Sequence, residues 1–568
     1  MNCLLLERKT GTNEITIESF IALALWKFLD TEEQIKVQLI EVDQTTSSVA
    51  ININEISHEN YRNNDEKKYI QLPMLKINDG NYNIIGLCSV LRGICRLMQS
   101  SSKTGSLATK LLGFKENCLL SASTSSLWVS FCEQDIIQCL INLTKTTDEI
   151  IEFPLQMLKL ECEFKNPVRM HNIFKVVREA KKDRSIQSES ATKVDLEHKY
   201  CHGNEANLSD FILYVIFKLI FLTVTNENEF ENNIPHILKW YRNMDMEFST
   251  LYDIIMMLLS KVPQKDIYFK EELPIVEANG KYFSLFKRQL IGHKMKKCKG
   301  FTNQNEIDLI LSKLNGLNID IKSEPGDENR NIIDDNIIEE LLSSGEFPQE
   351  RMDRKKSQLK SFTSEVIKIA HDDDIIVDFC SGTGHIGLLI ALLLPNCKVI
   401  ILENKEESIK RAIAKAKILK LNNVSYYQCN LEYFNEKFQI GCSLHACGIA
   451  TDLVLEKCYK LMANFISSPC CYGKIQDLGN LPQSEIFRAV LSADDLIKIA
   501  HCSDQTHDEK NVKHINLDKA RQGYFCMDII DTDRSLRAQE LGYTVQLTRL
   551  YPEDCTLKNR LLIGVYPR

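Results

Sequence analysis

A glycine-rich loop is the strongest chemical signal in this 568-residue sequence, and it lies in the segment DFCSGTGHIG. Gly382, Gly384 and Gly387 follow an apolar run, IIVDF (375–379), that is typical of a buried strand. Glycines at this spacing let the backbone turn tightly and approach a ligand closely. Glu403 ends the next apolar run, 19 residues after Gly384, where a carboxylate can accept hydrogen bonds from ribose hydroxyls. The pattern predicts a site for a nucleoside cofactor.

The charge beside the loop decides which cofactor fits best. Asp378 stands at the strand end, four residues before Gly382. A carboxylate there would repel a pyrophosphate and suits a cationic ligand, so S-adenosylmethionine is favoured over a dinucleotide; a vestigial loop is the third alternative. The segment resembles motif I of the class I methyltransferases, with one departure: Cys380 stands where the first glycine of that motif is expected.

The resemblance implies a role for each candidate cofactor residue. The three glycines and Cys380 would surround the amino-acid end of S-adenosylmethionine, and Asp378 would receive its ammonium group. Glu403 would bind the ribose; its alternative is a solvated acid at a strand end. Asn404 and Asn430 complete the predicted cofactor site, with Asn430 against the adenine or, alternatively, acting only as a turn former.

Two further strand ends carry histidine and cysteine. SLHACG places His445 and Cys447 after one predicted strand, and SSPCCYG places Cys470, Cys471 and Tyr472 after the next. Carboxyl ends of adjacent parallel strands line one crevice, so both groups should face the cofactor. Because adjacent cysteines chelate one metal poorly and neither segment contains a CxxC pair, we expect no metal here.

The chemistry of these strand ends has several interpretations. SPCCY could replace the (Asp/Asn/Ser)-Pro-Pro-aromatic loop of amino-methyltransferases, or its residues could simply pack beside the cofactor. HACGIATD followed by the paired cysteines is also similar to a group of Rossmann-fold methyltransferases that includes a tRNA 2′-O-methyltransferase family. That resemblance implies that His445 orients or deprotonates the nucleophile, with Cys470 and Tyr472 on the acceptor side as the other catalytic candidates.

Strand-like and helix-like runs alternate over residues 351–568, and these elements must position the residues described above. Such alternation predicts a mostly parallel, doubly wound Rossmann-like sheet with helices on both faces. TVQLTRLYP and NRLLIGVYP close the chain as two strands, and their short connection predicts an antiparallel edge pair.

The first 105 residues suggest a different fold. Residues 69–96 read as strand, Leu72-Pro73, strand, Asp79-Gly80 turn and helix, with the proline a candidate for a cis peptide bond. This order resembles the end of the thioredoxin-like domain of glutathione transferases. That family has an acid-Ser pair at the helix start for the γ-glutamyl group, whereas this chain has Gly86-Leu87, so glutathione chemistry is not expected.

Residues 106–275 show helical periodicity and resemble the all-helical C-terminal domain of glutathione transferases. Asp210 is expected to cap a core helix, which is a structural role. The resemblance implies that such a module, without catalytic residues, serves as a protein-interaction or dimerisation domain. Residues 276–350 are expected to be a basic segment followed by an acidic linker.

Composition bounds the remaining possibilities. The net charge of −8, the 44% hydrophobic content and the 20 irregularly spaced cysteines indicate a globular, reduced protein, and no signal peptide or membrane span is recognised. We therefore expect a soluble cytoplasmic protein. Two basic runs, 281–299 and 351–360, could form a phosphate-binding face for RNA.

Two functions follow from these expectations. The first is an S-adenosylmethionine-dependent methyltransferase of undefined acceptor, with RNA slightly favoured over protein. The alternative is a non-catalytic interaction protein built from two degenerate enzyme folds; a glutathione-dependent transferase is a weaker third.

Overall fold

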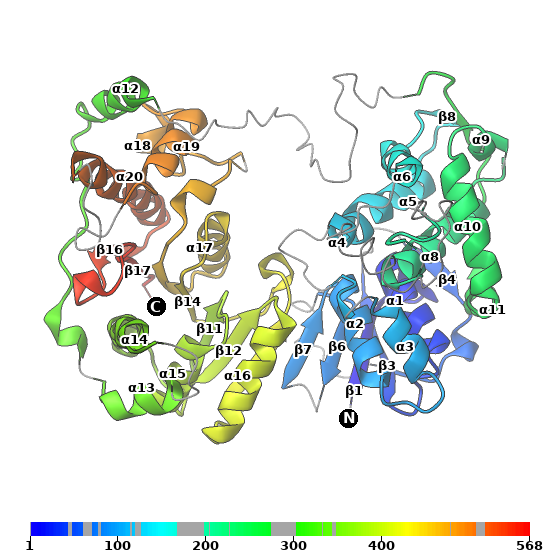
Figure 1. Ribbon diagram of the computed structural model, residues 1–568, viewed down its shortest axis with the longest axis horizontal. Coiled ribbons are helices and arrows are strands. Elements are labelled where there is room, and N and C mark those ends of the chain that lie inside the picture. The colour runs from blue at the N-terminus through cyan, green and yellow to red at the C-terminus, as the bar shows by residue number, and fades with distance from the viewer. Residues whose placement is uncertain are drawn as a thin grey trace, which may run out of the picture. The chain divides into compact units, whose positions relative to one another are not determined.

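The computed structural model describes most of the chain. The described residues are 2–43, 48–60, 71–77, 81–113, 116–119, 127–166, 198–203, 205–226, 228–273, 303–331, 333–342, 348–477, 479–506 and 517–567. The chain divides into two compact units, unit 1 (Met1–Lys294) and unit 2 (Met295–Arg568), which Figure 1 colours from blue to green and from green to red. Within these described ranges, no helix is both long and apolar enough to cross a membrane.

The sheet of unit 2 follows the predicted strands closely. Its strands are β11 (Ile375–Phe379), β12 (Lys398–Glu403), β13 (Val424–Gln428), β14 (Ile440–Leu444), β15 (Asn464–Ser468), β16 (Thr544–Arg549) and β17 (Arg560–Val565). They lie in the order β13-β12-β11-β14-β15-β17-β16, and the first five are parallel. β17 runs antiparallel to both β15 and β16, which confirms the predicted edge pair.

The helices of unit 2 connect and cover these strands. They are α12 (Gln304–Leu314), α13 (Asp335–Leu342), α14 (Gln349–Ile369), α15 (His385–Leu393), α16 (Glu406–Ile418), α17 (Ile449–Leu461), α18 (Glu485–Arg488), α19 (Ala493–Cys502) and α20 (Leu517–Glu540). α14, α15 and α16 lie on one side of the sheet and α17 and α20 on the other (Figure 1). The order reverses between β11 and β14, where a doubly wound sheet opens its ligand crevice.

Much of the expected linker is part of unit 2. Ile307, Ile310 and Leu314 of α12 are buried in the same core cluster as Leu496 and Ile499 of α19. The expectation of a basic segment followed by an acidic linker over 276–350 is therefore corrected from α12 onward, where the chain belongs to unit 2. The apolar positions of α12 recur at three and four residues, so the helix buries one face despite its polar surroundings. The basic run 281–299 lies outside the described residues.

Unit 1 begins with a small mixed sheet. Its strands are β1 (Asn2–Lys9), β2 (Glu14–Thr16), β3 (Ile35–Val42), β4 (Ser48–Ile51), β5 (His58–Asn60), β6 (Met74–Ile77), β7 (Tyr82–Ile85) and β9 (Leu259–Lys261), beside a separate pair, β8 (Ile150–Ile151) and β10 (Tyr268–Phe269). β3 is parallel to β1, whereas β6 is antiparallel to both β1 and β7. The Leu72-Pro73 peptide is cis, as predicted; the predicted Asp79-Gly80 turn lies outside the described residues.

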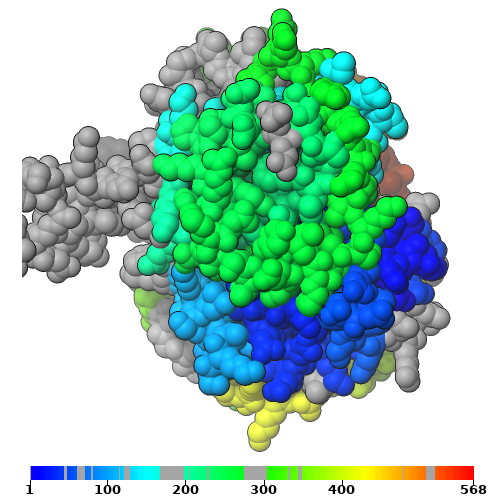
Figure 2. Space-filling view, turned by 90° about the vertical axis from the view of Figure 1, so that its right-hand side faces the viewer, coloured from blue at the N-terminus to red at the C-terminus, as the bar shows by residue number. Residues whose placement is uncertain are grey.

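The rest of unit 1 is mainly helical. Its helices are α1 (Ile17–Phe28), α2 (Leu87–Met98), α3 (Gly105–Leu111), α4 (Leu127–Ser130), α5 (Ile136–Lys145), α6 (Leu155–Lys165), α8 (Leu208–Thr223), α9 (Asn228–Glu231), α10 (Pro235–Glu247) and α11 (Ser249–Leu258). The helices from α8 to α11, in green, form a continuous surface in Figure 2.

Asp210 has the structural role expected of it. Its carboxylate accepts hydrogen bonds from the N–H of Asn207 (3.0 Å), the N–H of Cys201 (2.8 Å) and the indole N–H of Trp240 (2.8 Å). Asn207 in turn is the N-cap of α8, so the two side chains form a capping box. The helix start is thereby tied to the core of unit 1.

Candidate functional site

The glycine loop between β11 and α15 has the backbone that its sequence predicts. Gly382 and Gly384 adopt φ of 57° and 76°, in the left-handed region. A Cβ on Gly384 would lie 2.9 Å from Ala412 Cβ and 3.0 Å from Ile401 Cδ1, so this glycine is needed for packing against α16 and β12. A Cβ on Gly382 would meet no atom within 4 Å, which makes Gly382 the open side of the loop.

Cys380 and Gly387 complete the loop. Cys380 takes φ of 54°, in the left-handed region that a glycine adopts readily, at the position where the motif expects a glycine. A Cβ on Gly387 would lie 2.7 Å from Ile401 Cγ1 and 3.2 Å from Asp378 Cβ. This glycine therefore lets α15 approach the sheet closely.

Two carboxylates hold the loop from different strands. Asp378 is 1% exposed, and its Oδ2 accepts a hydrogen bond from the N–H of Gly387 at 2.9 Å. Burial raises the pKa of Asp378 to about 7. Glu403 accepts a hydrogen bond from the N–H of Gly382 (2.9 Å) through one oxygen and from the N–H of Lys405 (3.0 Å) through the other. Asp378, expected to receive the cofactor's ammonium group, thus lies buried beneath the loop and holds it through Gly387, whereas Glu403 lies at its open side.

The two predicted asparagines follow the neighbouring strand ends. Asn404 Nδ2 lies 3.5 Å from Asn430 Oδ1, and both side chains are half-buried. β12 and β13 are paired up to Glu403 and Gln428, so the register brings these asparagines together with Glu403. Asn430 also accepts, through its backbone carbonyl, a hydrogen bond from Tyr433 that begins a short turn. The two carboxamides are therefore grouped at the ends of β12 and β13.

His445 follows β14 and is fixed at both its backbone and its ring. Its N–H donates to the Ser468 carbonyl at 3.0 Å, and its Nε2 lies 3.1 Å from Gln358 Oε1. Gln358 uses its amide N–H to donate to the Cys555 carbonyl at 2.9 Å, so its oxygen faces the histidine. His445 Nε2 is then the donor, and Nδ1 keeps its lone pair. Burial, followed by the charge of Lys355, lowers the pKa of His445 to about 4.

Lys355 and Gln358 of α14 are site residues that sequence reasoning missed. The run 351–360 was interpreted as a phosphate-binding surface, but Lys355 is half-buried and acts electrostatically on Asp378 and His445. Burial lowers the pKa of Lys355, and the Asp378 carboxylate opposes that shift. Helical periodicity could have found it, because Lys355 lies four residues before the buried Leu359.

Other lysines of the same run are also engaged within unit 2. Lys356 Nζ lies 2.6 Å from Asp335 and 2.6 Å from Glu339, both on α13, and Lys360 forms an ion pair with Asp335. Lys356 and Lys360 are therefore paired with acids of unit 2, whereas Arg351 and Arg354 are exposed. RNA binding at this run stays a prediction.

Three cysteine sulfurs meet at the ends of β14 and β15. Cys447 Sγ lies 3.0 Å from Cys470 Sγ and 3.2 Å from Cys471 Sγ, and the last two sulfurs are 3.5 Å apart. Hydrogen bonding from Cys470, then from Cys471, together with the Lys474 ammonium, lowers the pKa of Cys447. Adjacent cysteines were expected to chelate one metal poorly, but the sulfurs of Cys470 and Cys471 both lie within 3.2 Å of Cys447 Sγ, which removes that objection to a shared ligand.

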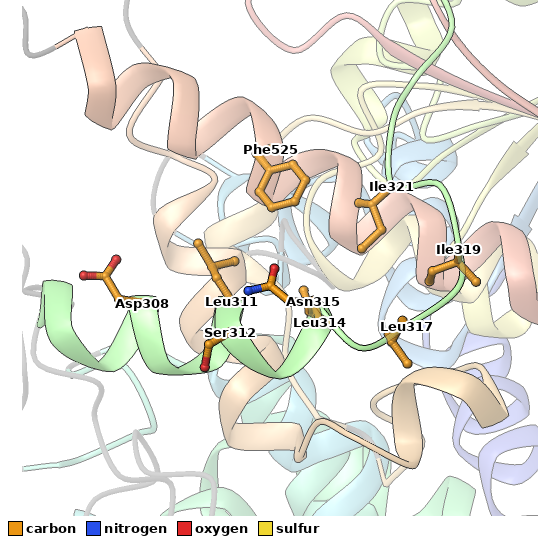
Figure 3. A pocket seen from close by; sticks show the side chains of 9 residues that line it. All are labelled: Asp308, Leu311, Ser312, Leu314, Asn315, Leu317, Ile319, Ile321 and Phe525. Carbon is orange, nitrogen blue, oxygen red and sulfur yellow. The ribbon is translucent and has the colours of Figure 1, made fainter.

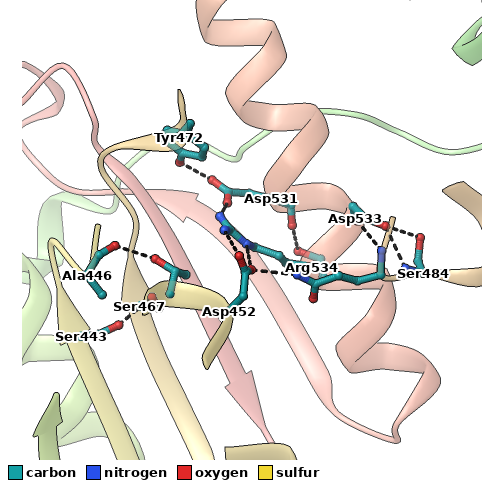
Figure 4. A network of polar contacts seen from close by, with 12 residues as sticks. Ser443, Ala446, Asp452, Ser467, Tyr472, Ser484, Asp531, Asp533 and Arg534 are labelled. Carbon is teal, nitrogen blue, oxygen red and sulfur yellow. Dashed lines mark hydrogen bonds and ion pairs between the residues drawn. The ribbon is translucent and has the colours of Figure 1, made fainter. Parts of the chain in front are cut away.

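Tyr472, a predicted catalytic residue, lies in a buried network instead of the crevice. Its hydroxyl donates to Asp531 at 2.6 Å, and it is 1% exposed. Arg534 donates to the same Asp531 (2.9 Å) and to Asp452 at the start of α17 (2.7 Å), as Figure 4 shows. Burial raises the pKa of Tyr472. The expectation that Tyr472 lies on the acceptor side is therefore corrected, because its hydroxyl is buried against Asp531.

One surface pocket lies apart from these strand ends. It has a volume of about 430 Å³ and is lined by α12, the segment that follows α12, and Phe525 of α20 (Figure 3). None of the residues of the glycine loop, of the carboxylate pair or of the thiol cluster lines it. The pocket therefore adds nothing to the candidate site.

The chain is similar in sequence to a methyltransferase domain model and, over nearly its full length, to curated proteins. A family model described as a methyltransferase domain matches residues 354–478, which contain the glycine loop, both carboxylates, His445 and the three cysteines. The chain is 35% identical over 575 residues to a glutathione S-transferase C-terminal domain-containing protein homolog of Drosophila pseudoobscura pseudoobscura, covering 97% of this chain and 95% of that protein. The human protein of the same description is 30% identical over 552 residues, covering 87% of this chain and 86% of that one.

Solved methyltransferase structures are also similar in part. Magnesium protoporphyrin IX methyltransferase from Synechocystis PCC 6803 with bound SAH has a TM-score of 0.25 and 13% identity, covering 41% of this chain and 93% of that one. An rRNA methylase from Streptococcus thermophilus has a TM-score of 0.23 and 12% identity, covering 37% of this chain and 97% of that one.

Proposed function

The chain belongs to the family of glutathione S-transferase C-terminal domain-containing proteins, and from this premise we propose that it is an S-adenosylmethionine-dependent methyltransferase. The observation that carries the proposal is the open side of the glycine loop at Gly382, directly beside the Glu403 carboxylate. A loop that approaches a ligand through backbone alone, next to a strand-end acid, fits the amino-acid end and the ribose of this cofactor.

The residues around the loop fit the remaining parts of the cofactor. Asn404 and Asn430 would meet the adenine side, and Asp378 would hold the loop in the binding conformation through Gly387. When bound, S-adenosylmethionine supplies a methyl group on a sulfonium, which is a good leaving group. The chain would contribute mainly positioning, in which bound reactants are held for an in-line transfer. His445, neutral and with a lone pair on Nδ1, would orient or accept the proton of the acceptor.

A calorimetric titration of S-adenosylmethionine into the full chain tests the proposal. We expect a micromolar dissociation constant, about −8 kcal/mol. Gly382→Asn should weaken binding at least about tenfold, roughly 1.4 kcal/mol, because the side chain would stand in the open space of the loop. Asparagine is chosen because it tolerates a left-handed backbone.

Gly11→Asn is the matched control for that substitution. Gly11 also has a positive φ, of 71°, and a Cβ there would meet no atom within 4 Å, but it lies in unit 1. The control should bind the cofactor as the unsubstituted chain does. Absence of binding by the unsubstituted chain, or equal losses in both variants, would contradict the proposal.

RNA is proposed as the methyl acceptor ahead of protein. The support is the basic segment 281–299, which carries seven Lys/Arg and no acid in a chain of net charge −8. Binding of a mixed cellular RNA should then weaken steeply as salt rises, since phosphate contacts release counterions. A salt-independent or undetectable interaction would turn the search towards protein acceptors.

A non-catalytic interaction protein is the second candidate, and one observation in unit 1 favours it. The first turn of α2 is where the glutathione-transferase resemblance implies a γ-glutamyl site. Here the N–H of Cys88 donates to the Glu133 side chain at 2.7 Å, so an internal carboxylate fills this position. Exposed Met246, Tyr252 and Met256 on α10 and α11 provide apolar surface for a protein partner. Methyl transfer to RNA or protein from cell extract would exclude this candidate.

A further inference from the structure

We infer that Cys447, Cys470 and Cys471 form a binding site for one thiophilic divalent cation of the zinc class, with a fourth coordination position left open. Their three sulfurs all lie within 4.8 Å of one another, at separations of 3.0, 3.2 and 3.5 Å. The inference rests on this geometry and is independent of whether the chain binds S-adenosylmethionine.

The fold explains why cysteines that are far apart in sequence meet. β14 and β15 are paired in parallel up to Leu444 and Ser468, so the residues that follow each strand leave the same edge of the sheet. The His445 N–H donates to the Ser468 carbonyl at 3.0 Å and holds the two chain segments together just before the cysteines.

Two backbone features bring the sulfurs to one point. Side chains of consecutive residues point to opposite faces in an extended strand. Cys471 is no longer extended, because its φ of −97° and ψ of 71° start the short turn Tyr472–Lys474. On the other segment, a Cβ on Gly448 would lie 2.7 Å from both the Cβ and the carbonyl oxygen of Lys474. The glycine thus allows the Cys447 segment to approach that turn directly.

The separations suit a thiolate site that closes around an ion. Zn–S bonds are about 2.3 Å long, which places the sulfurs of a tetrahedral site about 3.8 Å apart. The three sulfurs here are slightly closer than that, so small side-chain rotations would open them to the required distance. Cys447 is exposed and the other two cysteines are half-buried, so an ion can enter from solvent.

Charge and ligand number agree with this assignment. Three thiolates around a divalent ion leave one negative charge, and the Lys474 and Lys558 ammonium groups act electrostatically on Cys447 and Cys471 respectively. Sites with three protein ligands keep a position for water or an added ligand, unlike closed structural sites with four. A disulfide would use only two of the three sulfurs, so it does not account for the convergence of all three.

Cobalt(II) is the probe for this site. The full chain is purified under reduction, freed of metal and titrated with Co²⁺ while thiolate-to-cobalt charge transfer and visible ligand-field absorption are recorded. We expect saturation at one equivalent, tetrahedral-type bands and complete displacement by Zn²⁺. The cobalt spectrum is recorded without S-adenosylmethionine, so the result does not depend on whether the chain binds that cofactor.

Serine variants separate this site from other thiols. Cys447→Ser, Cys470→Ser and Cys471→Ser should each weaken cobalt binding by more than the roughly 10–100-fold typical of outer-shell changes. Cys162→Ser, which removes a half-buried thiol of α6 in unit 1, should leave the titration unchanged. Circular dichroism and thermal unfolding verify that each variant is folded.

Three results would overturn the inference. The first is the absence of thiolate-to-cobalt absorption in the folded, reduced chain. The second is an unchanged titration in a folded Cys447→Ser/Cys470→Ser double variant. The third is a disulfide among the three cysteines, found by mass spectrometry, that forms in air with added zinc as readily as without it.

Discussion

His445 is a single side chain held by three separate segments of unit 2. The Ser468 carbonyl fixes its backbone, and Gln358, itself bonded to the Cys555 carbonyl, fixes its ring. Burial keeps that ring neutral, with a pKa lowered to about 4 from the ordinary 6.5. The same burial makes protonation of His445 less favourable in the folded chain than in the unfolded chain.

A pH titration of stability tests this environment. The unfolded chain binds a proton at His445 below about pH 6.5, whereas the folded chain resists it until about pH 4. The contribution of His445 to stability is therefore complete above pH 6.5 and is lost as the pH falls towards 4. In calorimetry, His445→Asn should show a smaller drop in Tm over this interval than the unsubstituted chain. Parallel curves would mean that the pKa of His445 is not lowered in the folded chain.

At the scale of elements, the first turn of α2 is capped by a carboxylate from another helical segment of unit 1. Glu133 accepts the N–H of Cys88 at 2.7 Å, in the first turn of the helix, where a carboxylate also interacts favourably with the helix dipole. Glu133→Ala should lower the free energy of unfolding by about 1 kcal/mol, the usual effect of losing an N-terminal cap. Glu133→Gln keeps an acceptor and should lose less. Urea unfolding of the two variants measures the difference, and an alanine variant as stable as the glutamine variant would contradict the capping role.

Elements of unit 2 were predictable because their sequence signals are local. The apolar run 375–379 coincides with β11, and the next run ends at Glu403 as β12 does, since a strand buried on both faces is continuously apolar. The glycine loop and Glu403 were found for the same reason. The half-buried position of Lys355 was missed because the run 351–360 was interpreted from its positive charge alone, without its helical periodicity.

The thiol cluster was not predictable from spacing. Cys470 and Cys471 point the same way only because the chain leaves the extended conformation after Ser468. The buried position of Tyr472 likewise depends on its hydrogen bond to Asp531, which comes 59 residues later in the sequence. Contacts of this kind depend on tertiary packing and leave no pattern in the adjacent sequence.

At the scale of the whole molecule, the boundary of unit 2 decides which fragment is a stable domain. Residues 303–326 are hydrogen-bonded to the sheet. The N–H of Glu324 donates to the Leu547 carbonyl at 2.9 Å, and Arg549 Nε donates to the Ser323 hydroxyl at 2.9 Å. The segment thereby covers part of β16, the edge strand of the sheet. An uncovered edge strand offers free N–H and C=O groups to other chains.

A fragment of residues 303–568 should therefore be more stable than one of residues 351–568. The shorter fragment loses Ile307, Ile310 and Leu314, which are only 1%, 3% and 5% exposed against α19. At about 1.5–3 kcal/mol for each buried apolar side chain, the loss amounts to several kcal/mol. Urea unfolding should give a lower midpoint for 351–568, and light scattering should show that it aggregates through the uncovered edge. Equal midpoints and equal scattering would mean that α12 only rests on unit 2 and that the domain begins at α14.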